Sequence, residues 1–315
     1  MNDFSILFKK FGGINLIKHY LKNRVLFFAI QHLLFYGSSK KSLEILRLCI
    51  QFKMYKRLTK KYFYVKNQFL HEYNKESLSQ NKANIIWICW FQGIENAPLI
   101  VQKCYESVKT FFPYKTIHVI TTENFEKYVS IPEYITYKWK NKIISDAHFS
   151  DILRIELLIK YGGTWIDSTV LCTGNNIPKS FFDSELFVYQ ILKPGRDGHS
   201  FYTSNWFISA YSNNKILMFV RKLLYEYWKN NNRVVDYFIF HMFFAIVCEW
   251  FPEEYEKIPK YCNSIPHVLL LELFTEFSVQ RFEEIKSMSS IHKLSYKFDE
   301  GQINKQNTFY EFLFK

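Results

Sequence analysis

The segment that most constrains this fold runs from residue 148 to residue 171, with the sequence HFSDILRIELLIKYGGTWIDSTVL. Its first half has the apolar spacing of a packed helix, and two adjacent glycines, Gly162 and Gly163, follow that helix directly. Glycine readily adopts the positive φ values that commonly end a helix. Residues 164–166 then predict a short buried strand, which is followed at once by Asp167. A helix, a glycine turn and a strand in this order are typical of the α/β class.

Three charged side chains of this segment are candidates for a ligand site. Asp151 and Arg154 are three residues apart and so share a helix face, while Asp167 follows the strand. Open α/β sheets bind ligands at the carboxyl ends of their strands, so we expect the two carboxylates and the guanidinium to converge there. Two simpler interpretations stay open. Asp151 and Arg154 could form a surface ion pair worth about 0.3–0.5 kcal/mol, and Asp167 could cap the next turn through Ser168 or Thr169.

The remainder of residues 81–315 predicts one α/β domain. Strands and helices alternate in the order that gives a parallel sheet covered by helices. Strands are predicted at residues 84–90, 116–121, 164–171 and 186–191, and helices at residues 98–112, 123–129, 215–228 and 234–251. Residues 137–142 are predicted to form a basic linker, and residues 193–198 (KPGRDG) a loop that could close over a ligand.

Charge distinguishes residues 1–80 from that domain. This region contains 15 Lys and Arg against 4 Asp and Glu, which is a net charge of +11 in a chain whose total is +12. The polar residues 71–83 form the predicted boundary. Across the whole chain of 315 residues, a hydrophobic content of 48% is ample for a buried core, so disorder is not the expected state.

The basic region also carries two apolar patterns. Phe4, Leu7, Phe8 and Phe11 have helical spacing, and residues 25–36 (VLFFAIQHLLFY) are strongly apolar between basic residues. The second run is shorter than the roughly 20 residues that span a bilayer, so we expect residues 1–80 to lie on an anionic membrane surface. With only a poor signal-cleavage pattern behind that run, the expected location is cytoplasmic, peripheral on the inner face of a bacterial membrane. The alternative is a helical hairpin that packs on the α/β domain with a solvated lysine face.

Composition makes two other classes of site less favourable. Basic and aromatic residues interleave at residues 53–66, but no nucleic-acid module accompanies them, so no nucleic-acid partner is expected. The six cysteines lack CxxC spacing and most lie in apolar surroundings. They indicate buried thiols, and neither a zinc site nor a disulfide framework.

Two pairs of residues outside the central segment are candidates for ligand contacts. Trp90 and Gln92 follow the first predicted strand, where an aromatic ring could stack on a base, whereas core packing explains Trp87 of that strand equally well. His292 and Lys293 follow a predicted helix. The histidine could complete a metal shell and the lysine could neutralise negative charge, whereas a solvated loop is the simpler interpretation.

A further set of residues could line the opposite side of such a site. Asn205 and Trp206 lie in a polar and aromatic break beside a strand-like run, and Asp236 and His241 are five residues apart, a loose fit to one helix face. Helix caps and ordinary buried polar groups are the alternatives for these residues.

Taken together, the motifs resemble the capsular polysaccharide synthesis family of glycosyltransferases, which is related to sugar transferases with a DXD motif and to glucosylating toxin domains. The resemblance spans residues 84–297 and is carried by the pattern SDILR and YGGTWIDST within residues 150–169. Supporting matches lie at residues 86–93, 97–98, 104–107, 204–206, 236–238 and 292–294. The resemblance implies a GT-A-like, Rossmann-related mixed sheet flanked by helices, behind the basic helical N-terminal segment.

The same resemblance implies roles for the candidate residues. It implies a nucleotide-sugar donor, a UDP-sugar by preference, and a growing glycan or lipid-linked glycan of the capsule or cell surface as acceptor. Asp151 and Arg154 would contact the donor sugar, and Asp167 the nucleotide or a metal. Trp90, Gln92, Gly163 and Lys293 would complete the donor side, and Asn205, Trp206, Asp236 and His241 the acceptor side.

One departure from the family pattern concerns the metal. Thr169 stands where a DXD motif has its second aspartate. Dependence on Mn²⁺ or Mg²⁺ is therefore left open, with Asp167 and His292 as partial ligands.

Two other functions remain as alternatives. A chain that lost the second aspartate could be a non-catalytic scaffold that binds sugar nucleotides or glycans. A protein-modifying glycosyltransferase of toxin type is the other, and it is disfavoured because no delivery module or secretion signal is recognised in the sequence.

Overall fold

A computed structural model describes residues 13–73, 79–191, 201 and 203–315 of the chain. The apolar pattern at Phe4, Leu7, Phe8 and Phe11 and the predicted loop at residues 193–198 lie outside these described residues.

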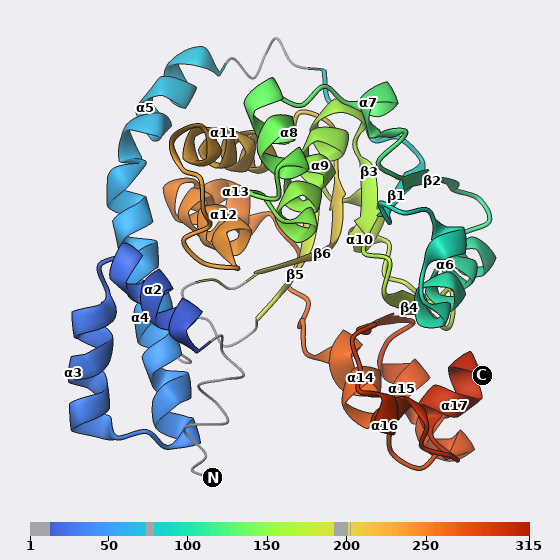
Figure 1. Ribbon diagram of the computed structural model, residues 1–315. Coiled ribbons are helices and arrows are strands. Elements are labelled where there is room, and N and C mark those ends of the chain that lie inside the picture. The colour runs from blue at the N-terminus through green and yellow to red at the C-terminus, as the bar shows by residue number, and fades with distance from the viewer. Residues whose placement is uncertain (1–12, 74–78, 192–200, 202) are drawn as a thin grey trace.

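A five-stranded mixed sheet forms the centre of the molecule (Figure 1). Its strands lie in the order β2 (Thr116–Ile120), β1 (Ile85–Cys89), β3 (Gly163–Ile166), β6 (Thr203–Ala210) and β5 (Leu186–Gln190). The first three are parallel, as the predicted β-α-β order requires, whereas β6 is antiparallel to both of its neighbours. The predicted mixed α/β class is confirmed. Residues 204–206, predicted as a break, are instead part of β6.

Helices cover both faces of this sheet. They are α6 (Leu99–Phe111), α7 (Phe125–Tyr128), α8 (Glu133–Lys140), α9 (Asp146–Tyr161), α10 (Ser180–Asp183), α11 (Lys215–Asn230) and α12 (Ile239–Trp250). Successive strand residues point to opposite faces, so Trp87 packs in the core on the α9, α11 and α12 side, while Ile86 and Ile88 pack on the α6 and α10 side. Burial on both faces explains the continuous apolar runs of the strands.

The predicted linker at residues 137–142 is wrong, because its first four residues complete helix α8. Trp139 of this helix is buried, and its ring stacks on that of Phe149 in α9 with the centroids 4.0 Å apart. Lysine is itself a good helix former, and a buried aromatic residue that packs this closely stabilises the segment as a helix.

The two central glycines are required by close approach of the backbone. Gly162 and Gly163 have φ values of 68° and 92°, in the left-handed region. A Cβ atom on Gly163 would lie 2.7 Å from the carbonyl oxygen of Ile85, the strand residue beside it. The pair therefore ends α9 and lets β3 enter the sheet against β1.

The predicted strand at residues 164–171 is two strands that belong to different sheets. The chain turns after Ile166, where the Val170 amide donates to the Asp167 carbonyl at 3.0 Å. Strand β4 (Val170–Cys172) then pairs antiparallel with β7 (Ile291–Lys293). A hydrophobic cluster joins α6 to the C-terminal helices α14 (Val268–Glu272), α15 (Val279–Met288) and α17 (Phe309–Phe314), with α13 (Pro252–Glu256) and α16 (Glu300–Ile303) as short connecting helices.

The basic N-terminal region is helical, as predicted. It consists of α2 (Ile14–Lys22), α3 (Leu26–Tyr36), α4 (Lys40–Lys61) and α5 (Phe63–Glu72), which lie along one side of the molecule in Figure 1. Phe69 of α5 packs on Phe219 of α11 with their ring centroids 4.1 Å apart, and the buried residues of α4 and α5 belong to the same core as α9, α11 and α12. Within the described residues, no helix is long and apolar enough to cross a membrane.

Candidate active site

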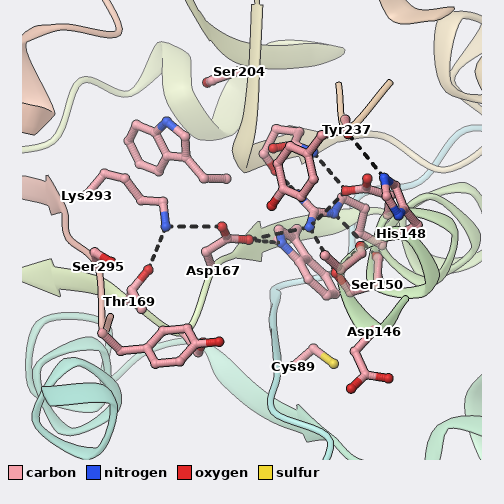
Figure 2. Close-up of a pocket in the computed structure, with 18 of the residues that line it drawn as sticks. Cys89, Asp146, His148, Ser150, Asp167, Thr169, Ser204, Tyr237, Lys293 and Ser295 are labelled. Carbon is pink, nitrogen blue, oxygen red and sulfur yellow. Dashed lines mark hydrogen bonds and ion pairs between the residues drawn. The ribbon is translucent and has the colours of Figure 1, made fainter. Parts of the chain in front are cut away.

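A cleft of about 820 Å³ opens at the carboxyl ends of β1 and β3. It is lined by the residues that follow β1, the first half of α9, the turn between β3 and β4, the beginning of β6 and the end of β7. Figure 2 shows that charged side chains from several of these elements point toward one another inside it. This is the edge of the sheet at which open α/β proteins bind ligands.

Arg154 connects the two carboxylates of the central motif. Its Nη2 atom lies 3.2 Å from Oδ1 of Asp151 and 3.6 Å from Oδ1 of Asp167. The guanidinium also lies 4.8 Å from the centre of the Trp165 ring, and its side chain is only 5% exposed. The interpretation of Asp151 and Arg154 as an exposed surface pair is therefore wrong, because both side chains are buried within the cleft wall.

Lys293 approaches Asp167 from the opposite side. Its Nζ atom lies 3.3 Å from Oδ2 of Asp167 and donates a hydrogen bond to Oγ1 of Thr169 at 2.5 Å (Figure 2). The lysine is brought there by the pairing of β7 with β4, which continues as a hydrogen bond from the Leu294 amide to the Thr169 carbonyl. Asp167 thus lies between a guanidinium and an ammonium group.

The two carboxylates differ in acidity because their surroundings differ. Burial alone would raise the pKa of Asp167, but Lys293, Arg154 and the indole N–H of Trp165 hold it below its ordinary value. Burial raises the pKa of Asp151 to about 7, against the opposing effect of Arg154 and with a smaller upward effect from Asp167. Pairs of carboxyl groups whose pKa values are separated in this way mark sites of acid–base or charge-dependent chemistry.

Several other predicted residues reach the cleft. Asn205 donates a hydrogen bond from Nδ2 to Oδ1 of Asp151 at 2.8 Å, and Trp206 stacks on Tyr189 with ring centroids 4.6 Å apart. Trp90 and Gln92 line the cleft near the end of β1. His241 also lines it, and burial lowers the pKa of its imidazole to about 3.

Three predicted site residues lie elsewhere. Gly163 is at the first position of β3, at the other end of the strand from Asp167, and serves the packing against Ile85. The carboxylate of Asp236 accepts a hydrogen bond from the Phe238 amide at 2.8 Å, and Asp236 borders a different cavity, beside the N-terminal helices. Neither residue lines the cleft.

His292 is the third, and strand geometry explains the error. Adjacent residues of a strand point to opposite sides, so the inward position of Lys293 directs His292 away from the cleft. The His292 ring instead lies 2.9 Å from the hydroxyl of Thr173, and burial lowers its pKa to about 4. It cannot join Asp167 in a metal site.

The described residues of this cleft do not fit a resident divalent cation. The position between Asp167 and Thr169 is taken by the ammonium group of Lys293, and Thr169 replaces a charged oxygen ligand with a hydroxyl. Within the described residues, no group of three or more His, Cys, Asp or Glu side chains is arranged to hold a metal ion. Hard divalent cations favour several oxygen ligands, which this arrangement does not provide.

Sequence reasoning missed two residues that shape the cleft. His148 lies one turn before Asp151 on α9, and its Nε2 atom is 3.2 Å from the Tyr237 carbonyl oxygen. Tyr296 lies three residues after Lys293. Its ring packs edge to face on the Trp90 ring, with the ring centroids 5.2 Å apart. The helical spacing of His148 and Asp151 was a usable signal, whereas nothing in the sequence indicated the contact of Tyr296 with Trp90.

The fold and the cleft define an α/β protein with a carboxylate held between two cations at the carboxyl edge of its sheet. The model of one protein family, described as capsular polysaccharide synthesis protein, matches residues 35–313, so the chain belongs to that family. Among solved structures, one titled PaToxG Glycosyltransferase is similar at 13% identity and a TM-score of 0.37, covering 85% of this chain and 97% of that chain. A superposition of that quality carries no inference about function. No curated protein matches the chain.

Proposed function

We propose that this protein is a glycosyltransferase that transfers a sugar from a nucleotide-sugar donor, a UDP-sugar by preference, to a growing capsular or cell-surface polysaccharide. The observation that carries the proposal is the placement of Asp167 between Arg154 and Lys293 at the ligand-binding edge of the sheet. Membership of a capsular polysaccharide synthesis family supports the same activity and the class of acceptor.

Cleavage of a sugar–diphosphate bond places negative charge on the departing nucleotide. Arg154 and Lys293 are preorganised cations, since both are largely buried and are already held by Asp167. Donors aimed in advance at developing charge need little reorganisation during the reaction, and such electrostatic stabilisation is usually the largest contribution to catalysis. In this proposal the two side chains carry the charge neutralisation that a metal ion supplies in DXD enzymes.

Asp151 is suited to a hydroxyl group of the donor sugar. One of its carboxylate oxygens is shared by Asn205 and Arg154, so the side chain is fixed in direction. Fixed carboxylates orient sugars by accepting hydrogen bonds from their hydroxyl groups, and orientation of a reactant can supply several orders of magnitude in rate. The proposal assigns His241 and Trp206, which line the same cleft, to the acceptor surface.

Trp90 and Tyr296 offer a place for the base. Their rings pack edge to face, and Gln92 lines the same cleft. Aromatic faces hold nucleobases by stacking, which is worth about 1–3 kcal/mol per base. We therefore assign the base to this end and the diphosphate to the space between Arg154 and Lys293.

Slow hydrolysis of a panel of nucleotide sugars tests the proposal without knowledge of the acceptor. The native chain should hydrolyse at least one donor, and Asp167→Asn should abolish that turnover. Asp183→Asn, the same change at an exposed aspartate on α10 outside the cleft, should leave it intact. Donor binding in calorimetry without turnover, even with lipid-linked acceptors added, would favour a scaffold. Absence of any binding would contradict the nucleotide-sugar assignment.

A further inference from the structure

The N-terminal helices enclose an apolar cavity next to the cleft. Its volume is about 640 Å³, and it lies between α2, α3, α4 and residues 235–238. Much of its wall is aliphatic: Leu16, Leu26, Leu33, Leu43, Leu46 and Ile50. A cavity of this size and lining suits an apolar ligand.

A second cavity, of about 590 Å³, lies beside the first and has the opposite chemistry. Five cationic side chains line it, and none of its described lining residues is acidic. The five are Lys22, Arg57, Lys60, Lys61 and Arg233. Clustered lysines and arginines of this kind attract phosphate groups.

Residues 235–238 connect these spaces with the candidate active site. Val235 lines both the basic and the apolar cavity. Tyr237 and Phe238 line both the apolar cavity and the cleft that contains Asp167. A basic compartment, an apolar compartment and the cleft therefore follow one another along a single short segment.

Helix α3 is apolar on both of its faces. One face borders the apolar cavity, while the other exposes Phe27 and Leu34 to 80% each and Phe35 to 78%. The helix contains no Asp, Glu, Lys or Arg. A helix that is hydrophobic all round is normally covered, and exposed apolar side chains gathered on one helix mark a surface for interaction.

The charges around α3 indicate what covers it. Residues 14–61 contain 11 Lys and Arg and a single acidic residue, Glu44. A second copy of the chain would bring two such positive layers together, which electrostatic repulsion opposes. An anionic lipid bilayer complements both the charge and the apolar surface.

We propose that α2, α3 and α4 dock on an anionic lipid bilayer, with Phe27, Leu34 and Phe35 inserted among the lipid chains. The basic cavity then receives a lipid phosphate, and the apolar cavity receives a hydrocarbon chain. If the proposed function holds, this docking presents a lipid-linked acceptor at Tyr237, next to the cleft.

Vesicle flotation tests the docking directly and needs no donor. The full chain should float with vesicles of phosphatidylglycerol and phosphatidylcholine in equal parts, and not with phosphatidylcholine alone. Leu34→Glu should weaken the binding about tenfold, because it removes an inserted leucine. Leu271→Glu is the matched control, a leucine on α14 with the same exposure of 80%, and should bind as the native chain does.

Two further variants separate the contributions of charge and cavity. Replacement of both Lys60 and Lys61 by Gln should weaken binding to anionic vesicles roughly thirtyfold, at about 1 kcal/mol per cation near the surface. Ala29→Leu narrows the apolar cavity, so it should also weaken binding while the melting temperature without vesicles does not fall. Unchanged binding in Leu34→Glu would overturn the proposal.

Two other results would overturn it as well. One is equal binding to neutral and anionic vesicles, and the other is a dimer in solution that Leu34→Glu dissociates. Donor hydrolysis without lipid is measured on the same samples. Hydrolysis without flotation rejects the docking alone, whereas flotation without hydrolysis rejects the proposed activity alone.

Discussion

The cleft and the N-terminal helical layer, which consists of α2, α3, α4 and α5, both place cations near apolar side chains, but they hold those cations differently. In the cleft, Arg154 and Lys293 are 5% and 18% exposed and are fixed by a shared carboxylate. In the layer, Lys60 and Lys61 are exposed on the surface of α4. Buried, paired charges suit one defined charge distribution, such as a transition state, whereas exposed charges suit a fluid anionic surface. The two regions should therefore respond very differently to loss of a single positive charge.

The largest effect is expected from Lys293→Met, which removes a buried cation of the cleft. Turnover should fall about 100- to 1,000-fold, the usual result of deleting one preorganised donor to a developing negative charge. Steady-state donor hydrolysis measures it. The matched change in the helical layer is Lys41→Met, at an exposed lysine of α4, and it should leave hydrolysis unchanged. Equal losses of turnover in the two variants would contradict the proposed difference between the cleft and the helical layer.

Gly163→Ala should separate packing from ligand binding. The added Cβ would lie 2.7 Å from the Ile85 carbonyl oxygen, at a φ of 92° that alanine rarely adopts. We expect a loss of roughly 1–3 kcal/mol in the free energy of unfolding, measured by urea denaturation. The KM for donor should stay the same in the folded fraction. A raised KM for the donor with an unchanged free energy of unfolding would instead indicate that Gly163 takes part in donor binding.

Asp151→Asn should change how stability depends on pH. Burial raises the pKa of Asp151 to about 7 in the folded protein, above the value of about 3.9 in an unfolded chain. The stability that this group contributes is thus full at acidic pH and is lost as the pH rises through about 7. Between about pH 5 and about pH 8, the free energy of unfolding of the variant should rise by about 1–3 kcal/mol relative to that of the native chain. Asp183→Asn is the control. A difference in free energy of unfolding between Asp151→Asn and the native chain that stays constant with pH would contradict the raised pKa.

The smallest effect is expected for stability in the helical layer. Lys41→Met changes one exposed side chain, and such substitutions usually alter the free energy of unfolding by less than about 0.5 kcal/mol. Thermal unfolding of the variant and the native chain measures the difference. A larger loss would mean that the basic residues of this layer are part of the structural framework, as the cations of the cleft are.

The sequence predicted what local pattern determines. Helix α9, the glycine pair and Asp167 form one continuous segment, so their spacing was enough to place Asp151, Arg154 and Asp167 together. Because these residues belong to one continuous segment, the local pattern alone indicates that they lie together, without knowledge of any long-range contact.

The errors concern residues whose position depends on distant segments. Which of His292 and Lys293 faces the cleft depends on the register of β7 against β4, more than 100 residues away in the chain. Helical spacing predicts Asp236 on the acceptor side, because that spacing contains no information on the packing of α2 and α4 around the residue. The first four residues of the predicted basic linker belong to α8, where Trp139 stacks on Phe149. In each case tertiary packing decided the outcome.

The most direct test of the account is donor turnover by the native chain in the presence of a chelator. The site places Lys293 between Asp167 and Thr169, so hydrolysis of the accepted nucleotide sugar should proceed in EDTA at the rate seen with added Mn²⁺. Turnover that disappears in EDTA and returns with Mn²⁺ would contradict the assignment of Lys293 to the place of the cation.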